Sequence, residues 1–325
     1  MRVLVVGGAG YVGSHACKAL AAEGHEPVVY DSLVTGHEDS VRWGPFERGD
    51  LLDAERLDDV LVRHRPDVVM HFAAFAYVGE SVLEPARYYR NNVVGSLSLL
   101  EAMRRNGVGT IVFSSTCATY GIPASLPITE ATPQSPINPY GYTKLVVERA
   151  LADYAHAYGL RWVAMRYFNA AGCDPDGELG ERHEPETHAI PLAIKAALGS
   201  GPRFKVFGTD YDTPDGSAVR DYIHVSDLAS AHVKAIPYLD HGGDSGAFNL
   251  ATGRGVSVIE LLQAVEKATG RTVPADFAPR RPGDPPALFA VADKARDLLG
   301  WTPRFAAIED TVATAAAWFG RHHNR

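Results

Sequence analysis

A tyrosine and a lysine four positions apart, Tyr140 and Lys144, have the clearest chemical potential in this chain. Four residues make about one helical turn, so both side chains would lie on one helix face. A neighbouring ammonium favours the phenolate and lowers the phenol pKa from about 10 toward neutrality. Such a phenol can take a proton from a sugar or alcohol hydroxyl. The spacing is common by chance, so its meaning depends on the elements around it.

Short apolar runs alternate with amphipathic stretches in the first half of the chain. The expected strands are Val3–Val6, Pro27–Tyr30, Val68–Phe72, Thr110–Phe113 and Trp162–Phe168, and the expected helices are Val12–Ala22, Ala54–His64, Pro85–Arg105 and Tyr140–Tyr158. Near-continuous Val/Ile runs between helices are typical of a parallel sheet covered on both faces. The pattern predicts an α/β fold with a doubly wound parallel sheet.

A glycine-rich turn, Gly7–Gly13, directly follows the first expected strand and opens the first expected helix. Glycines spaced as GxxGxxG let the backbone approach a pyrophosphate, whose charge meets the free amides of the helix. Asp31 ends the second expected strand, where a carboxylate can accept hydrogen bonds from ribose hydroxyls and repels a 2′-phosphate. We therefore expect NAD as the cofactor, with Asp50 and Leu51 near the adenine.

The regular alternation of expected strands and helices ends after Asn169. A loop over Asp174–Thr187 and a proline-rich irregular stretch over Ala278–Pro286 separate shorter elements. The expected helices there are Ile190–Leu198, Ser226–Leu239, Val258–Thr269, Asp293–Leu299 and Ile308–Phe319, and the expected strands include Phe204–Phe207 and Ala247–Leu250. We expect an NAD-binding Rossmann domain over residues 1–175, also taking in roughly 222–250. A smaller C-terminal α/β lobe would bind the substrate over residues 176–221 and 251–325.

Composition restricts the partners. A net charge of -8 argues against a nucleic-acid or anionic-membrane partner, and no stretch approaches the ~20 consecutive apolar residues of a membrane span. The apolar run at the N-terminus is too short for a signal peptide. The three cysteines cannot pair completely and indicate reduced thiols in a cytoplasmic protein. Neither they nor the 13 histidines show metal-ligand spacing, so no metal is expected.

The strand Thr110–Phe113 runs into a hydroxyl-rich loop, Ser114–Thr116, beyond the carboxyl end of the sheet. Together with Tyr140 and Lys144 over an NAD site, this set resembles the extended short-chain dehydrogenase/reductase superfamily across essentially the whole chain. The closest resemblance is to the UDP-glucose 4-epimerase family, and also to UDP-xylose/UDP-arabinose 4-epimerases. It is carried by Gly7–His15, His71–Ser81, Phe113–Gly121, Asn138–Lys144, Arg166–Asn169, Val219–His224 and Phe277–Asp284.

The resemblance implies roles for individual residues. Tyr140 would deprotonate the sugar 4-hydroxyl, Lys144 would hold the nicotinamide ribose and lower the Tyr140 pKa, and Thr116 would hydrogen bond the same sugar oxygen. The expected cofactor-binding residues are Gly7, Gly10, Tyr11, Val12, Gly13, Asp31, Ser32, Asp50, Leu51, Phe72, Ala73, Ala74, Asn91, Ser114, Tyr140, Lys144 and Tyr167. The expected substrate-binding residues are Thr116, Tyr140, Asn169, His188, Ala189, Phe207, Arg220, Tyr222, Arg281, Asp284 and Leu288.

The activity implied is a nucleotide-sugar 4-epimerase (an isomerase) that interconverts UDP-glucose and UDP-galactose through a transient 4-keto sugar. UDP-xylose/UDP-arabinose and UDP-GlcNAc/UDP-GalNAc remain alternatives, because few residues contact the rotating sugar ring. Leu288, which stands where some members carry a bulky tyrosine, leaves room for the N-acetylated sugars. A dehydratase is disfavoured, because Thr116 is followed by Cys117 rather than by carboxylates. A non-catalytic NAD-binding regulator is disfavoured by the intact Tyr140 and Lys144. The family also implies a homodimer through helices near Pro85–Arg105 and Tyr140–Tyr158.

Overall fold

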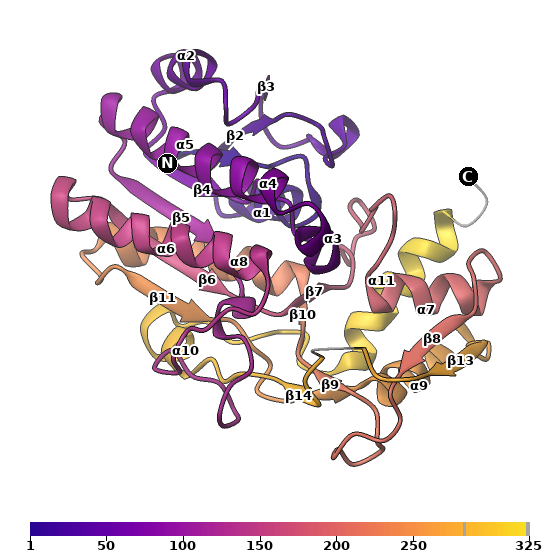
Figure 1. Ribbon diagram of the computed structural model, residues 1–325. Helices are drawn as coiled ribbons and strands as arrows, with labels where there is room; N and C mark the ends of the chain where they lie inside the picture. Colours follow the sequence, from indigo (N-terminus) through magenta and orange to yellow (C-terminus); the bar gives the residue numbers. More distant parts are fainter. Residues whose placement is uncertain (282–283, 323–325) are drawn as a thin grey trace.

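The computed structural model describes residues 1–281 and 284–322, and a parallel seven-stranded sheet forms the central layer of this part of the chain (Figure 1). The strand order is β11-β6-β5-β4-β1-β2-β3. The strands are β1 (Arg2–Val6), β2 (Glu26–Asp31), β3 (Phe46–Arg48), β4 (Val68–His71), β5 (Thr110–Ser114), β6 (Arg161–Arg166) and β11 (Gly246–Asn249). The order reverses between β1 and β4, which is the place where ligands bind in such sheets. The doubly wound fold expected from the sequence is confirmed.

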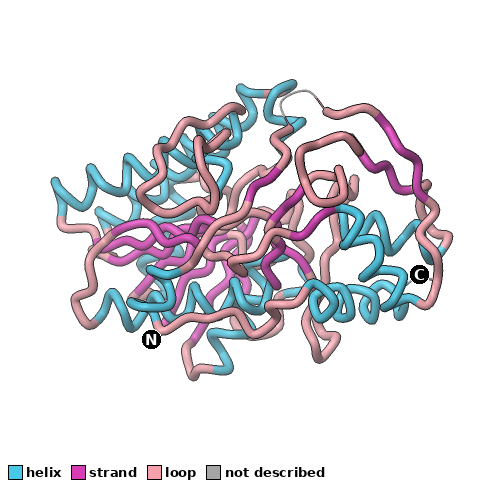
Figure 2. The backbone as a smooth tube through the Cα atoms, turned by 90° about the horizontal axis from the view of Figure 1, so that it is seen from below, coloured by secondary structure: helices cyan, strands magenta, loops and turns pink. Residues whose placement is uncertain are grey.

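Helices cover both faces of this sheet (Figure 2). The helices and helical turns of the first half are α1 (Tyr11–Ala22), η1 (Glu38–Ser40), α2 (Ala54–His64), α3 (Val78–Leu83), α4 (Pro85–Tyr88), the π-helical η2 (Tyr89–Val94), α5 (Gly95–Arg105), η3 (Cys117–Tyr120) and α6 (Pro139–Tyr158). The single helix expected over Pro85–Arg105 is thus interrupted by a π-helical segment, a feature often found near functional sites.

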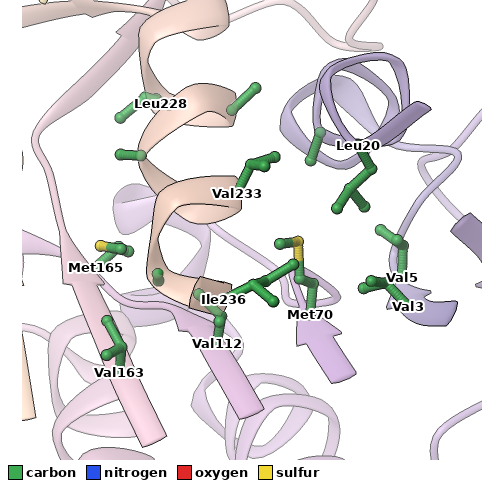
Figure 3. Close-up of a cluster of buried hydrophobic side chains, with 14 of the residues drawn as sticks. Val3, Val5, Leu20, Met70, Val112, Val163, Met165, Leu228, Val233 and Ile236 are labelled. Carbon is green, nitrogen blue, oxygen red and sulfur yellow. The ribbon is translucent and has the colours of Figure 1, made fainter. Parts of the chain in front are cut away.

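Alternate residues of β1 face opposite cores. Val3 and Val5 pack with Leu20 of α1 and with α8 (Val225–Asp240), as Figure 3 shows. Leu4 and Val6 pack in a second cluster with side chains of α2, α5 and α6. Because side chains of a strand alternate between its faces, a strand buried on both sides must be apolar at every position. This requirement explains the unbroken run of aliphatic residues in β1.

The second half builds a smaller lobe with its own apolar core, which includes Ile194, Leu261 and Val312. Its elements are β7 (Asn169–Ala171), α7 (Ala189–Leu198), β8 (Phe204–Phe207), β9 (Val219–Arg220), β10 (Tyr222–His224), β12 (Val256–Ser257), α9 (Val258–Thr269), β13 (Ala275–Ala278), β14 (Ala287–Leu288) and α11 (Ile308–His322). The helix α10 (Asp293–Leu299) instead packs with α8 in the core of the seven-stranded sheet. The parallel pair β7 and β10 connects this lobe to the end of β6. Within the described residues, no helix is both long and apolar enough to cross a membrane.

Two expectations at element ends need correction or restriction. The strand expected over Trp162–Phe168 ends at Arg166. The chain turns there, because the Tyr167 carbonyl accepts from Cys117 N and Asn169 begins the pairing with β10. Residues 282–283, within the expected irregular stretch, and residues 323–325 lie outside the described residues.

A buried ion pair joins α6 to the end of β6. Arg166 donates to Glu148 from Nη2 (2.5 Å) and from Nε (3.0 Å), and the two side chains are only 8% and 4% exposed. Glu148 also accepts from the hydroxyl of Ser115, at the end of β5. Arg166 donates to the Tyr120 hydroxyl (2.8 Å), which in turn donates to Asn249 of β11 (2.7 Å). The ends of three strands and helix α6 are therefore held by one network.

The first prediction concerns this pair. Arg166→Met leaves the Glu148 carboxylate buried without its cation, and we expect a loss of about 3–5 kcal/mol in the free energy of unfolding. Urea denaturation measures this loss. A Glu148→Leu/Arg166→Met double variant should recover most of it, because no unpaired charge remains. Arg104→Met, which breaks an exposed ion pair with Glu101 on α5, is the control and should leave the midpoint unchanged. Equal midpoints for the two arginine variants would contradict the prediction.

Candidate active site

The glycine turn between β1 and α1 admits no side chain at two positions. A Cβ on Gly7 would lie 2.5 Å from the Ala73 amide nitrogen, and one on Gly13 would lie 2.1 Å from the Gly7 carbonyl oxygen. Gly7 also has a φ of 82°, which favours glycine. The turn therefore sits directly against the loop after β4. This close approach places the N-terminus of α1 at the point where the strand order reverses.

The N-terminus of α1 suits an anion. The first amides of a helix lack intrahelical acceptors, and no side chain caps α1 at Gly10 or places an acid in its first turn. Asp31, at the end of β2, accepts from the amides of Ala9 (3.0 Å) and Leu33 (2.8 Å) and is 8% exposed. Burial raises the pKa of Asp31. An acid-free helix N-terminus with a carboxylate at the end of the next strand fits the pyrophosphate and adenosine ribose of NAD.

The other residues expected around the cofactor are distributed over the ends of β2, β4, β5 and β6. Tyr30 donates to the carbonyl of Asp50 (2.7 Å), which places Asp50 and Leu51 beyond β2. The Phe72 ring lies 4.7 Å from the His232 ring of α8, and the Tyr167 hydroxyl is 2.6 Å from Ser114 Oγ. The remaining expected residues follow the same edge: Ser32 after β2, Ala73 and Ala74 after β4, and Asn91 in η2.

Helix α6 carries Tyr140 and Lys144 to the carboxyl end of β5. The helix starts at Pro139, and Asn138 caps it by accepting from the Gly141 amide (2.9 Å). The Thr116 hydroxyl lies close enough to the Tyr140 phenol to lower its pKa, and it donates to the Tyr167 carbonyl (3.5 Å). Lys144 is 3% exposed and donates to the Ser114 carbonyl (2.7 Å). The structure thus brings together the hydroxyl, phenol and amine that the sequence placed in two separate segments.

The electrostatics of this pair differ from the sequence expectation. Burial raises the pKa of Tyr140 to about 12, against the hydrogen bond from Thr116, which lowers it. Burial also lowers the pKa of Lys144 to about 7, against the carboxylate of Glu148, which raises it. Among the protein's own side chains, Lys144 therefore does not bring the Tyr140 pKa toward neutrality, contrary to the expectation from the sequence. Desolvation is the largest cause for both groups, and the amine of Lys144 donates to the Ser114 carbonyl.

The expected substrate residues belong mostly to the smaller lobe. Arg220 of β9 forms an ion pair with Asp284, and the Arg281 guanidinium lies 3.9 Å from the centroid of the Phe207 ring. Asn169 donates to the Asp221 carbonyl (2.9 Å) beside Tyr222. The other members are His188 and Ala189 at the start of α7, and Leu288 of β14, which contacts the cluster containing Cys117 and Tyr120.

Sequence reasoning missed several residues that position this site. Glu148 is four residues past Lys144 on α6, so the spacing of Tyr140, Lys144 and Glu148 was a usable signal. Asn92, buried in η2, binds Phe75 N (2.9 Å) and Thr143 Oγ1 (3.1 Å), and so ties η2 to α6. Asp221 lies between β9 and β10, which carry the expected substrate residues Arg220 and Tyr222, and its carboxylate accepts from Thr252 Oγ1 (2.9 Å). No local spacing indicates the partners of Asn92 or Asp221.

Comparison with known proteins agrees with this geometry. Residues 3–251 match the NAD dependent epimerase/dehydratase family. The UDP-glucose 4-epimerase of Rhizobium meliloti (strain 1021) is 58% identical over 317 residues, 98% of this chain and 96% of that protein. The crystal structure of UDP-glucose 4-epimerase from Brucella ovis in complex with NAD has a TM-score of 0.97 at 55% identity and covers 98% of each chain.

A further structure extends the comparison to a nucleotide. UDP-glucose 4-epimerase from Bifidobacterium longum, in complex with NAD+ and UDP, has a TM-score of 0.93 at 39% identity and covers 100% of this chain and 99% of its own. Both the family match and the near-full-length relatives include the glycine turn, the Thr116 loop and helix α6. The chain therefore belongs to the NAD-dependent epimerase/dehydratase family, in its UDP-glucose 4-epimerase branch.

Proposed function

We propose that this protein inverts carbon 4 of a UDP-hexose and interconverts UDP-glucose and UDP-galactose. One observation supports this proposal above the others: Thr116, Tyr140 and Lys144 converge beside an NAD site at the carboxyl edge of the sheet. Bound NAD supplies a hydride acceptor and donor, so the sugar needs only a group that removes and returns a proton. No carboxylate follows Thr116 in its loop to serve the elimination of a dehydratase.

Each catalytic residue has a separate task in this proposal. The phenol oxygen of Tyr140 takes the proton from the sugar 4-hydroxyl and returns it to the same oxygen after the 4-keto sugar has turned its other face to the cofactor. The Thr116 hydroxyl, which lies beside this phenol and lowers its pKa, holds the same sugar oxygen. Lys144 orients the nicotinamide ribose and supplies positive charge in a region of low dielectric constant, where such a charge acts strongly. Glu148 is a positioning residue, because it favours the charged form of Lys144 and holds α6 in place.

The UDP portion is the anchor of the substrate. Arg220 and Arg281 offer the paired donors that phosphate oxygens accept, and Asp284 holds the Arg220 guanidinium in position. Asn169, His188, Ala189, Phe207 and Tyr222 complete the proposed binding surface. A sugar that presents both faces of carbon 4 to one cofactor must turn between the two hydride transfers. Tight binding of UDP and few contacts with the hexose satisfy that requirement.

The quaternary structure and location are further proposals. The helices that the family uses for dimers expose apolar side chains: Tyr89 and Val94 in η2 are 41% and 51% exposed, and Val146 in α6 is 40% exposed. Contacts between η2 and α6 make this one face. We propose a homodimer through it. The cysteines Cys17, Cys117 and Cys173 are buried free thiols, which supports a reducing cytoplasmic location.

The second prediction tests Tyr140. Tyr140→Phe removes the proton acceptor, and we expect kcat for UDP-galactose conversion to fall about 10²–10⁴-fold. Conversion is measured without added cofactor, with NADH absorbance followed in parallel. Tyr142→Phe, an exposed phenol on the same helix, is the matched control and should retain full activity. Retained activity in Tyr140→Phe would refute the assignment of the base.

The third prediction concerns the size of the sugar pocket. Leu288 leaves room that a tyrosine would fill, so Leu288→Tyr should lower the turnover ratio of UDP-GlcNAc to UDP-glucose by roughly 10–100-fold. Turnover of both substrates by wild type and variant gives the ratio. Leu288→Met keeps the volume and should leave the ratio unchanged. An unaltered ratio in Leu288→Tyr would show that this side chain does not limit the substrate.

The fourth prediction tests the dimer. A Val94→Glu/Val146→Glu double variant places like charges opposite each other at the proposed interface and should yield monomers of the 35.0 kDa chain. Light scattering during size-exclusion chromatography distinguishes monomer from dimer. Val62→Glu, 59% exposed on α2, is the control and should remain dimeric. A monomeric wild type, or a dimeric double variant, would contradict the proposed interface.

A further inference from the structure

Four potential metal ligands gather in the loop that joins β7 to α7. They are Glu181, His183, Glu186 and His188, and one ligand atom from each lies within 4.8 Å of all the others. Sequence reasoning did not single out this cluster, because two histidines five positions apart, without a pair of cysteines at zinc-motif spacing, are not specific to a metal site. The folded loop brings the four side chains around one point.

The distances between these atoms scatter around those expected for a tetrahedral ion, and the shortest of them is a direct hydrogen bond between Glu181 and His188. Glu181 Oε1 lies 2.5 Å from His188 Nδ1 and 3.2 Å from His183 Nδ1. Glu186 Oε1 lies 3.6 Å from His188 Nδ1 and 3.9 Å from His183 Nδ1. Ligands at ~2.0–2.2 Å from a tetrahedral Zn²⁺ are about 3.3–3.5 Å apart. The four distances fall on both sides of that value, so small side-chain movements would complete the geometry.

Glu186 gives independent evidence for a ligand. Its side chain is only 5% exposed, and its Oε2 has no hydrogen-bond partner among the described residues. Its other oxygen, Oε1, accepts from the amides of Thr187 and His188 (2.9 Å each) and is also the atom that lies 3.6 Å from His188 Nδ1. The Glu181 side chain, 2% exposed, adds a second buried carboxylate. Two buried carboxylates at one point repel each other, and a bound cation would stabilise both.

We propose that Glu181, His183, Glu186 and His188 bind one divalent transition-metal ion, Zn²⁺ in the first instance. Imidazole nitrogens with carboxylate oxygens are a ligand set that Zn²⁺ accepts, and they are less suited to Ca²⁺ or Mg²⁺, which prefer oxygen alone. Two carboxylates and two neutral imidazoles leave the complex without net charge. Four protein ligands fill a tetrahedral shell, which is typical of structural rather than catalytic zinc.

The surroundings indicate what such an ion would stabilise. The Tyr11 ring meets the His183 ring edge-on at 5.9 Å, and its hydroxyl donates to the Gly172 carbonyl (2.5 Å). The Tyr77 ring lies 6.1 Å from His183 and 6.3 Å from His188. The cluster is therefore fixed between the first turn of α1, in the NAD site, and the start of α7. An ion there would order the loop that presents the proposed substrate residue His188.

The experiment measures metal content and stability in the full chain, purified without a polyhistidine tag. We expect about one zinc per chain by elemental analysis after exchange into chelator-free buffer. Removal of the metal by a chelator should lower Tm by roughly 5 °C, and added Zn²⁺ should restore it. Neither readout depends on catalysis, so failure of the zinc proposal leaves the epimerase proposal intact.

Variants connect the metal to these ligands. His183→Ala and the nearly isosteric Glu186→Gln should each weaken Zn²⁺ binding by more than about tenfold in a competition titration with a chromogenic chelator. Circular dichroism verifies that each variant is folded. His156→Ala, an exposed histidine on α6, is the matched control and should bind as wild type does. Zinc binding that is equal in wild type, His183→Ala and Glu186→Gln would overturn the proposal. A wild-type Tm that does not change with the chelator would also overturn the proposal. The four side chains would then be stabilised only by hydrogen bonds among themselves, without a metal ion.

Discussion

The buried ion pair between Glu148 and Arg166 is the interaction on which the geometry of the active site depends. Helix α6 carries Tyr140 and Lys144, whereas Thr116 follows β5 and Tyr167 follows β6. The pair binds α6 to the end of β6, and Glu148 also holds Ser115, the residue before Thr116. Burying two charges costs several kcal/mol per ion, so a pair of this kind is weak evidence for a gain in stability. The pair instead fixes the position of α6 relative to the ends of β5 and β6.

The same burial sets the protonation of the catalytic groups. A site that excludes water disfavours both the phenolate of Tyr140 and the ammonium of Lys144, and the pKa values move in those directions. Tyr140 therefore becomes a base only when positive charge is held close to it. Lys144 and an oxidised nicotinamide ring are the two sources that the site accommodates, and Glu148 favours the charged form of the first. In the proposed mechanism, proton transfer would therefore depend on a bound hydride acceptor.

Local patterns predicted the parts of this structure that depend on neighbouring residues. The bounds expected for α2, α9, α10 and β8 agree with the structure, because each is a short periodic segment with clear ends. The helix face shared by Tyr140 and Lys144 follows from spacing alone. Spacing could not predict the direction in which the Tyr140 pKa shifts, because that direction depends on how deeply the phenol is buried. The Glu148–Arg166 pair and the His183–His188 cluster were also missed, since both arise from tertiary contacts or loop folding that no periodicity encodes.

The arrangement of the smaller lobe separates nucleotide anchoring from sugar selection. Leu288 of β14 is paired in register with Arg220 of β9, so a residue near the sugar and a proposed phosphate anchor lie on adjacent strands. Side chains of paired residues project from backbone positions fixed by the ladder, and a change at Leu288 leaves the backbone of Arg220 in place. Arg220 is further held by Asp284. In the proposed site, the volume available to the sugar could therefore change by substitution at Leu288 while the binding of UDP by Arg220 is preserved.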